Sequence, residues 1–471
     1  MTIDDVRDAP AGPDPEHDED EHLGEDYALT AAFVEKVVDA ADAGDGERLH
    51  DLLEDLHPAD IADLMGFLTS EHRSVLVLWL APDVLAEVLP ELDDSIREQV
   101  LERLPSGALA EALQELDSDD AAAVVEEMED DQRRAVLAAM PEQDRAAIES
   151  SLGYEEDSAG RLMQREVMAA PEFWSVGNTI DHLRAQGEDL PELFFDIYVV
   201  DPQYRPVGGV AVSRLLRSAR DVKLAALMEP INEIEVHQDQ EEVAYIFEKY
   251  HLISAPVVDF GGRLVGQITV DDIVNIIQEE NREDILRLAG VSDEGRDASV
   301  MGVVRSRIPW LIINLGTAVA ASLVIGVFSE QIEALVALAI LMPIVASIGG
   351  NAGVQAMTVA VRSLAARELS AANAVRIVRR EALVGFMNGA TIAVLLAAIA
   401  AVWFGMPMLS LVIGLAVTIN LVAAALAGAL IPMILDRLDR DPAVASPVFV
   451  TWITDTVGFF TFLGLAAVIL L

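Results

Sequence analysis

The chain has 471 residues, of which 52% are hydrophobic, 79 are acidic and 31 are basic. The absence of cysteine excludes disulfides, thiolate metal sites and a cysteine nucleophile. A net charge of −48 argues against nucleic acid and anionic lipid head groups as partners and permits divalent-cation binding. An acidic or salt-adapted proteome would give the same composition. Because residues 308–471 hold eight acidic and seven basic residues, nearly all of the excess charge lies before residue 308.

The first segment, residues 1–26, is rich in Asp, Glu, Pro and Gly. It has neither the basic start nor the apolar stretch of a signal peptide, so we expect a disordered acidic tail.

Residues 27–159 show a repeating helical pattern. A large apolar residue recurs every twelve positions, at Leu56, Leu68, Leu80, Leu92, Leu104, Leu116, Met128, Met140 and Leu152. Units this short bury an apolar face only by stacking, so the pattern predicts an all-α superhelix. Carboxylates gather on its outside, Asp119 and Asp120 among them, and they indicate either a solvated face or a cation site.

Residues 160–226 and 227–277 are two copies of one α+β pattern. FDIYVVDPQYRPVGGVAVSRLL (195–216) parallels ISAPVVDFGGRLVGQITVDDIV (253–274), each predicting strand, Asp turn, strand and helix. The second copy resembles CBS domains, many of which bind adenine nucleotides through an aspartate at the start of the last helix. Asp272 matches that aspartate, whereas the first copy has Ser213 and Arg214. ATP binding and a purely mechanical dimerising role both remain open.

Residues 271–307 are expected to be mostly one long amphipathic helix, with residues 278–307 connecting the soluble region to the membrane region. Residues 308–471 predict five membrane helices, at about 308–328, 334–361, 382–404, 409–435 and 447–471. Arginines lie before the first span, between spans two and three, and between spans four and five. The N-terminus is therefore predicted to be cytoplasmic and the C-terminus outside.

Span five carries one charged residue, Asp455. An aspartate within a lipid-spanning helix costs roughly 2.5–3.5 kcal/mol on insertion scales and usually faces a bundle interior or a water-filled cavity. The membrane region has no lysine, and its arginines lie outside the apolar spans. Asp455 is interpreted as an ion site in a cation pathway; the alternative is a protonated or water-bonded group that only joins helices.

Span two contains LMPIVASIGGNAGVQAMTVAVRSL. Pro343 can kink this helix, and Gly349, Gly350 and Gly353 remove side chains. Asn351 and Gln355 add amides one turn apart. The combination favours a narrow polar lining near Asp455 over a simple helix-packing motif.

The chain resembles the MgtE family of magnesium channels and transporters along nearly its whole length. The resemblance rests on the acidic superhelix, the tandem CBS pattern, the connecting helix, five spans and the segments GGNAGVQ, DPAVASPV and TDTVGFF. It implies a multi-domain inner-membrane protein with an all-α N-terminal domain, tandem CBS domains, a connecting plug helix and a five-helix transmembrane domain. It also implies a homodimer with a pore lined by spans two and five, in which Asp455 faces hydrated Mg²⁺. The implied pore lining is Pro343, Gly349, Gly350, Asn351, Gly353, Gln355, Thr451 and Gly458.

The resemblance further implies that cytoplasmic Mg²⁺ closes the channel by bridging carboxylates. The matching residues are Asp119, Asp120, Asp239, Glu241, Asp272, Glu280, Glu283, Asp284 and Asp441. The pattern departs from the family at four positions: His251 and Asn275 stand where carboxylates are expected, and Ser446 and Pro447 stand near the place of an expected asparagine.

Two other functions compete with a Mg²⁺ channel. A proton- or sodium-coupled transporter of divalent metals (Mg²⁺, Co²⁺, Mn²⁺) would also use an intramembrane carboxylate. A CBS-regulated enzyme is disfavoured, because the sequence has no phosphate-binding GxxxxGK[ST] loop, no HExxH and no recognisable nucleophile–base pair.

Overall fold

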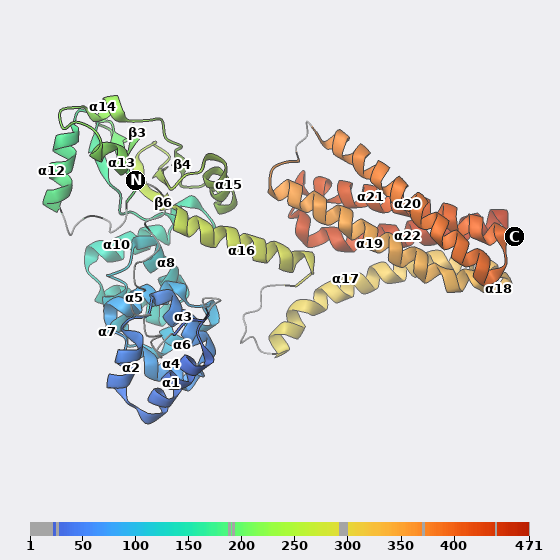
Figure 1. The fold of residues 1–471 in the computed structure, drawn as a ribbon, viewed down its shortest axis with the longest axis horizontal. Helices are drawn as coiled ribbons and strands as arrows, with labels where there is room; N and C mark the ends of the chain where they lie inside the picture. Colours follow the sequence, from blue (N-terminus) through green and yellow to red (C-terminus); the bar gives the residue numbers. More distant parts are fainter. Residues whose placement is uncertain are drawn as a thin grey trace, which may run out of the picture. The chain divides into compact units, whose positions relative to one another are not determined.

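The computed structural model describes residues 22–24, 28–186, 190, 194–291, 300–369, 373–438 and 440–470, without the side chains of 444–446 (Figure 1). Apart from residues 22–24, the predicted tail 1–26 lies outside the described residues. The chain divides into two compact units, Met1–Ile276 and Ile277–Leu471, and each is described by itself.

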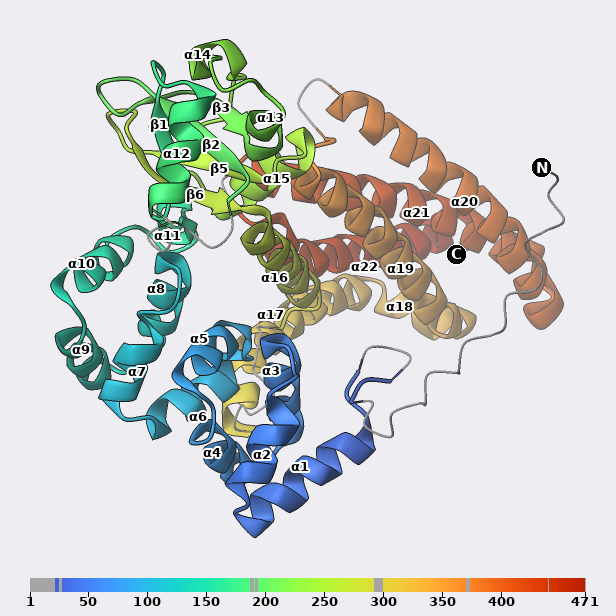
Figure 2. The same cartoon turned by 60° about the vertical axis from the view of Figure 1, so that its left-hand side comes forward.

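Short helices form the first part of unit 1 and enclose one continuous apolar core (Figure 2). They are α1 (Ala31–Ala43), α2 (Gly46–Leu53), α3 (Pro58–Phe67), α4 (Ser70–Val77), α5 (Pro82–Glu91), α6 (Asp94–Arg103), α7 (Ser106–Ala112), α8 (Ser118–Glu126), α9 (Asp130–Ala139) and α10 (Glu142–Ser151). The predicted all-α domain is confirmed.

The twelve-residue period reflects how these helices end. Leu68, Leu92, Leu104 and Met140 each follow the last residue of a helix in extended conformation, and all four are buried. The backbone N–H of each donates to the carbonyl three residues earlier. The recurring apolar residue therefore closes one helix and anchors the turn in the core.

Two three-stranded sheets follow, as the internal repeat predicts. Their elements are α11 (Ala159–Leu162), β1 (Ala169–Pro171), α12 (Val176–Gln186), β2 (Asp196–Val200), β3 (Pro206–Ala211), α13 (Val212–Leu216), α14 (Leu224–Leu227), β4 (Ile234–Glu235), α15 (Gln240–Tyr250), β5 (Ser254–Val258) and β6 (Leu264–Thr269). The strand orders are β1-β2-β3 and β4-β5-β6. In each sheet the first pair is parallel and the second antiparallel, with a register shift at Val199/Val200 and again at Val257/Val258.

The hairpin turns of the two copies are also equivalent. Asp201 Oδ1 accepts from the N–H of Gln203 and Arg205 at 2.8 and 2.9 Å. Asp259 Oδ1 accepts from Gly261 and Arg263 at 2.7 and 2.9 Å. The repeated aspartate is thus a turn residue. The predicted boundary at residue 160 needs correction, because Ala159 and Met163 are fully buried in the core of the second copy.

The prediction of one helix over residues 271–307 is wrong in its length. Helix α16 (Val270–Leu288) ends where Gly290 takes φ +69°, and Val291 N–H donates to the Leu286 carbonyl at 3.0 Å. This left-handed glycine closes the helix. Residues 292–299 lie outside the described residues, and residues 300–307 begin the next helix.

Unit 2 consists of the end of α16 and a helical bundle whose long members lie side by side (Figures 1 and 2). Its helices are α17 (Val300–Val327), α18 (Ser329–Ala334), α19 (Ala337–Ala365), α20 (Ala374–Phe404), α21 (Pro407–Asp436) and α22 (Pro442–Ile469). Among the residues that the structure describes, five helices are long and apolar enough to cross a membrane, which confirms the predicted number of spans. The fourth of them, α21, is the most buried and packs against α19, α20 and α22.

Candidate functional site

Asp455 lies within α22 and is half-buried. Thr451, one turn earlier, is exposed, so the two form a polar strip on α22. In the described part of the chain the carboxylate of Asp455 has no hydrogen-bond or ion-pair partner. A carboxylate left without a partner in a membrane helix is suited to compensation by a cation.

A second polar strip runs along α19. Pro343, Ser347, Asn351 and Gln355 recur every four residues, and all are exposed on the surface of the bundle. Thr358 continues the strip on the same face. Sequence reasoning identified Pro343, Asn351 and Gln355 but missed Ser347 and Thr358. The four-residue spacing could have revealed Ser347, and the three-residue step from Gln355 along the same helix face could have revealed Thr358.

Three glycines predicted to line the pore lie instead in helix contacts. Gly349, Gly353 and Gly458 are buried. A Cβ on Gly353 would lie 2.5 Å from Val450 Cγ1, and one on Gly458 would lie 2.7 Å from Asn420 Nδ2. The close approach of neighbouring helices requires these glycines, so their assignment to the lining is corrected. Gly350 differs, because a Cβ there would meet open space.

Asn420 of α21 is a polar residue that sequence reasoning overlooked. It is fully buried, and its Nδ2 donates to the Val345 carbonyl of α19 at 3.1 Å. The available signal was a strongly polar residue within the uncharged stretch 382–435, which holds two asparagines, Asn388 and Asn420.

In unit 1, the structure brings together the predicted carboxylates of the helical domain and of the last CBS helix. Asp119 and Asp120 begin α8, and Asp271 and Asp272 begin α16. Burial, reinforced by Asp117, raises the pKa of Asp120 to about 6. Burial, reinforced by Asp271, raises the pKa of Asp272 to about 7. Burial and Asp272 raise the pKa of Asp119 as well, so these groups repel one another at neutral pH.

Hydrogen bonds join the helical domain to the second CBS copy beside this cluster. Ser118 Oγ donates to Glu166 Oε2 at 2.9 Å, and Arg161 Nε donates to Glu126 Oε2 at 3.1 Å. The repelling carboxylates are thus held near each other by neighbouring contacts that the sequence did not reveal.

Asp239 and Glu241 are not part of that cluster. Asp239 is exposed and caps α15, accepting from the Glu241 N–H at 2.9 Å. This local role accounts for Asp239 without a metal; metal binding by the pair stays a prediction.

In unit 2, a second group of carboxylates forms where α16 ends. Burial, together with Asp441 and Glu280, raises the pKa of Asp284. Arg287 pairs with Glu283 and with Asp441, its Nη1 lying 2.9 Å from Asp441 Oδ2. Leu288 packs against a small core that includes Met357, Val361, Ala443 and Val450 of α19 and α22. The end of α16 is thereby attached to the start of α22.

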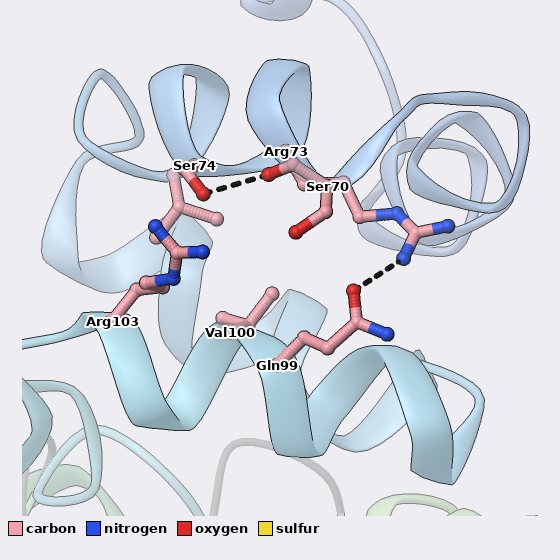
Figure 3. A pocket seen from close by; sticks show the side chains of 7 residues that line it. Ser70, Arg73, Ser74, Gln99, Val100 and Arg103 are labelled. Carbon is pink, nitrogen blue, oxygen red and sulfur yellow. Dashed lines mark hydrogen bonds between the residues drawn. The ribbon is translucent and has the colours of Figure 1, made fainter. Parts of the chain in front are cut away.

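No preformed metal site accompanies these clusters in the described ranges, where no group of three or more His, Asp or Glu side chains is arranged to hold a metal ion. Figure 3 shows a small pocket between α4 and α6, crossed by a 2.9 Å hydrogen bond from Arg73 Nη1 to Gln99 Oε1. Its volume of about 10 Å³ has room for a single water at most.

Comparisons with known proteins agree with this arrangement. Residues 342–465 match the family described as "Divalent cation transporter", residues 56–157 the MgtE intracellular N domain, and residues 224–279 the CBS domain. The chain is 34% identical to the magnesium transporter MgtE of Thermus thermophilus over 92% of this chain and 97% of that protein. It is 32% identical to the magnesium transporter MgtE of Enterococcus faecalis over 67% of this chain and 70% of that protein.

Among solved structures, the cytosolic domain of the Mg²⁺ channel MgtE in complex with ATP is similar, with a TM-score of 0.49 and 34% identity. The matched region covers 52% of this chain and 99% of the solved chain. From the sequence relationships and the five membrane-spanning helices, we conclude that the chain is an integral membrane protein of the MgtE family of magnesium transporters, a transport family rather than an enzyme family.

Proposed function

We propose that the protein is a Mg²⁺-selective channel that carries magnesium into the cell down its electrochemical gradient, with Asp455 as the ion site. The supporting observation is a carboxylate on a spanning helix that is half-buried and has no partner among the described residues. Mg²⁺ is a hard ion that prefers oxygen ligands and retains several waters, so a carboxylate facing a hydrated ion suits it. The membrane potential, worth about 2.3 kcal/mol per charge per 100 mV, would drive entry.

The exposed polar strip of α19 supports a homodimer. Ser347, Asn351 and Gln355 lie on the surface of a single chain. Polar side chains facing lipid are unfavourable, whereas the same strip facing a second copy would border a polar path. In this proposal, Asn351, Gln355, Pro343, Gly350 and Thr451 line the pore between two subunits.

We further propose that cytoplasmic Mg²⁺ closes the channel. Asp119, Asp120 and Asp272 form one mutually repelling group, and Glu280, Asp284 and Asp441 form another. A divalent cation would relieve the repulsion in each group and stabilise the conformation that brings the carboxylates together. Loss of the ion would release α16 and favour opening.

The proposal places the N-terminus in the cytoplasm and the C-terminus outside. Arg362, Arg437 and the α16 end belong to the same end of the bundle, since Leu288 packs near Val361 and Asp441 follows α21. Positive residues concentrate on the cytoplasmic side of bacterial inner-membrane proteins.

ATP binding at the second CBS copy is a second proposal, carried by Asp272 at the start of α16. Asp272 Oδ2 already accepts from Thr269 Oγ1 at 3.0 Å, which would orient the carboxylate for a ribose. Isothermal titration of the full chain with ATP, comparing wild type with Asp272→Asn, tests it. Equal affinities would remove Asp272 from this role.

The transport proposal is tested by Mg²⁺ flux into liposomes at low and high internal Mg²⁺. We expect Asp455→Asn to abolish selective flux in a folded protein, and Asp436→Asn, an exposed carboxylate at the end of α21, to leave it intact. Normal flux through Asp455→Asn would overturn the proposed ion site. Flux that requires a proton or sodium gradient would instead identify a coupled transporter.

A further inference from the structure

The membrane bundle contains a buried amide between the two helices proposed to line the pore. Asn420 belongs to α21, which the proposed pore lining does not use. Its side chain meets Gly349 of α19 and Gly458 of α22: a Cβ on Gly349 would lie 3.0 Å from Asn420 Cγ, and one on Gly458 would lie 3.1 Å from it. Both glycines therefore leave the space that the amide fills.

This contact is polar and directional. Asn420 is fully buried, and its Nδ2 donates to the Val345 carbonyl at 3.1 Å. Its Oδ1 is buried and has no hydrogen-bond partner among the described residues. A buried acceptor without a partner costs free energy, so stability alone would favour an apolar side chain here. A polar group that costs stability can instead specify one arrangement of helices.

The Asn420 amide contacts the faces of α19 and α22 that lie opposite or beside the proposed pore residues, so it can influence which way those residues point. On α22, Gly458 follows Asp455 by three residues, and the buried Thr454 precedes Asp455 directly. Because Gly458 and Thr454 pack inside the bundle, the rotation of α22 about its axis is fixed. The direction in which the Asp455 side chain projects is fixed with it. On α19, Gly349 and Gly353 are buried in the bundle, so Asn351 and Gln355 lie on the opposite, exposed face of the helix.

We propose that Asn420 is a positioning residue for magnesium transport. Its amide, held between Gly349 and Gly458, sets the rotation of α19 and α22 so that Asp455 and the polar strip of α19 face the same path. This inference rests on the proposed role of Asp455 as the ion site.

The first test compares Asn420→Leu with Val417→Ala in the full-length protein, measuring Mg²⁺ and Ca²⁺ uptake into liposomes together with thermal stability. Val417 is a fully buried apolar residue one turn away on α21. We expect Asn420→Leu to keep its melting temperature, to raise the half-saturating Mg²⁺ concentration at least threefold and to lower the Mg²⁺/Ca²⁺ uptake ratio. Val417→Ala should lower the melting temperature and leave both transport parameters unchanged, because lost packing reduces only the amount of active protein.

The second test is suppression. Gly458→Ala places a methyl group 2.7 Å from Asn420 Nδ2 and should impair transport. Adding Asn420→Ala removes the obstructing amide, so the double variant should transport better than Gly458→Ala alone. Wild-type half-saturation and selectivity in Asn420→Leu, or no rescue in the double variant, would overturn the positioning role. Normal flux through Asp455→Asn would instead reject the ion site itself, so the two failures are distinguishable.

Discussion

Arg287 Nη1 lies 2.9 Å from Asp441 Oδ2 and connects the end of α16 to the first turn of α22. Asp441 also caps α22, its Oδ1 accepting from the Ala443 N–H at 2.7 Å. The guanidinium thus supplies a positive charge among Glu283, Asp284 and Asp441, the place where a regulatory Mg²⁺ is proposed. Arg287 therefore partly neutralises these carboxylates even when no Mg²⁺ is bound.

If this ion pair helps to hold the closed arrangement, Arg287→Gln should increase flux at low internal Mg²⁺. Both side chains are about a third exposed, and exposed pairs contribute roughly 0.2–1 kcal/mol, so we expect an increase of at most about fivefold. High internal Mg²⁺ should still close the variant. Arg134→Gln, which removes an exposed pair with Asp131 on α9, is the matched control. Flux equal to wild type at every Mg²⁺ concentration would show that the pair plays no part in gating.

Neutralising Glu280, Glu283 and Asp284 together should leave the channel conducting at high internal Mg²⁺. The expected reason is loss of the anionic groups that a closing ion would bridge. Replacing Glu47, Glu71 and Asp83, exposed residues in the first turns of α2, α4 and α5, changes the net charge equally and should preserve inhibition. Flux assays at graded internal Mg²⁺ concentrations measure the inhibition of each triple variant. If both triple variants lost inhibition, general charge rather than this cluster would be sensed. If both remained inhibited, the cluster would play no part in closing the channel.

The raised pKa values of Asp120 and Asp272 predict how stability depends on pH without Mg²⁺. Their pKa values rise from the ordinary 3.8 to about 6 and about 7, so the folded protein binds more protons than the unfolded chain in this range. The stabilisation is present below pH 3.8 and is lost as the pH rises through 6 and 7. In chelator, the melting temperature should therefore fall between pH 4 and pH 8.

Asp272→Asn should reduce this pH dependence and stabilise the metal-free protein at pH 8, because it removes a buried negative charge that neighbouring carboxylates repel. Added Mg²⁺ should stabilise the wild-type protein more as the pH rises, because cations bind the deprotonated carboxylates. Its stabilising effect therefore changes with pH in the opposite direction to that of protonation. Differential scanning fluorimetry of the detergent-solubilised full chain measures both effects. A melting temperature that rises with pH in chelator would contradict the assigned repulsion.

A buried hydrogen-bond chain joins the two CBS copies and allows a separate stability test. Tyr198 Oη donates to Ser254 Oγ at 3.0 Å, and Ser254 Oγ donates to Asp196 Oδ2 at 2.9 Å. Ser254→Ala should destabilise the protein by about 1–3 kcal/mol, because it leaves a buried phenol without its acceptor. The double variant Tyr198→Phe/Ser254→Ala, which removes both partners, should be closer to wild type. A double variant less stable than Ser254→Ala would refute this explanation.

Much of the architecture could be predicted from local patterns. The recurrence of Leu68, Leu92 and Leu104 indicated stacked short helices, since each residue both ends a helix and enters the core. The paired motifs around Asp201 and Asp259 indicated two equivalent hairpins. Long apolar stretches indicated five membrane helices because their length alone matches a bilayer. These features depend on residues close together in the chain, where spacing and turn chemistry determine structure.

Contacts between distant segments could not be predicted in this way. Nothing near Gly349 or Gly458 in the sequence shows that both make room for Asn420, and nothing near Arg287 points to Asp441. The length of α16 was also misjudged, because the left-handed turn at Gly290 competes with an amphipathic pattern that continues beyond it. The sequence by itself determined the domains, the spans and the residue types available for chemistry. Only the tertiary structure decided which glycines pack, which polar groups stay exposed and which charges meet, because these depend on how separate helices are rotated and brought together.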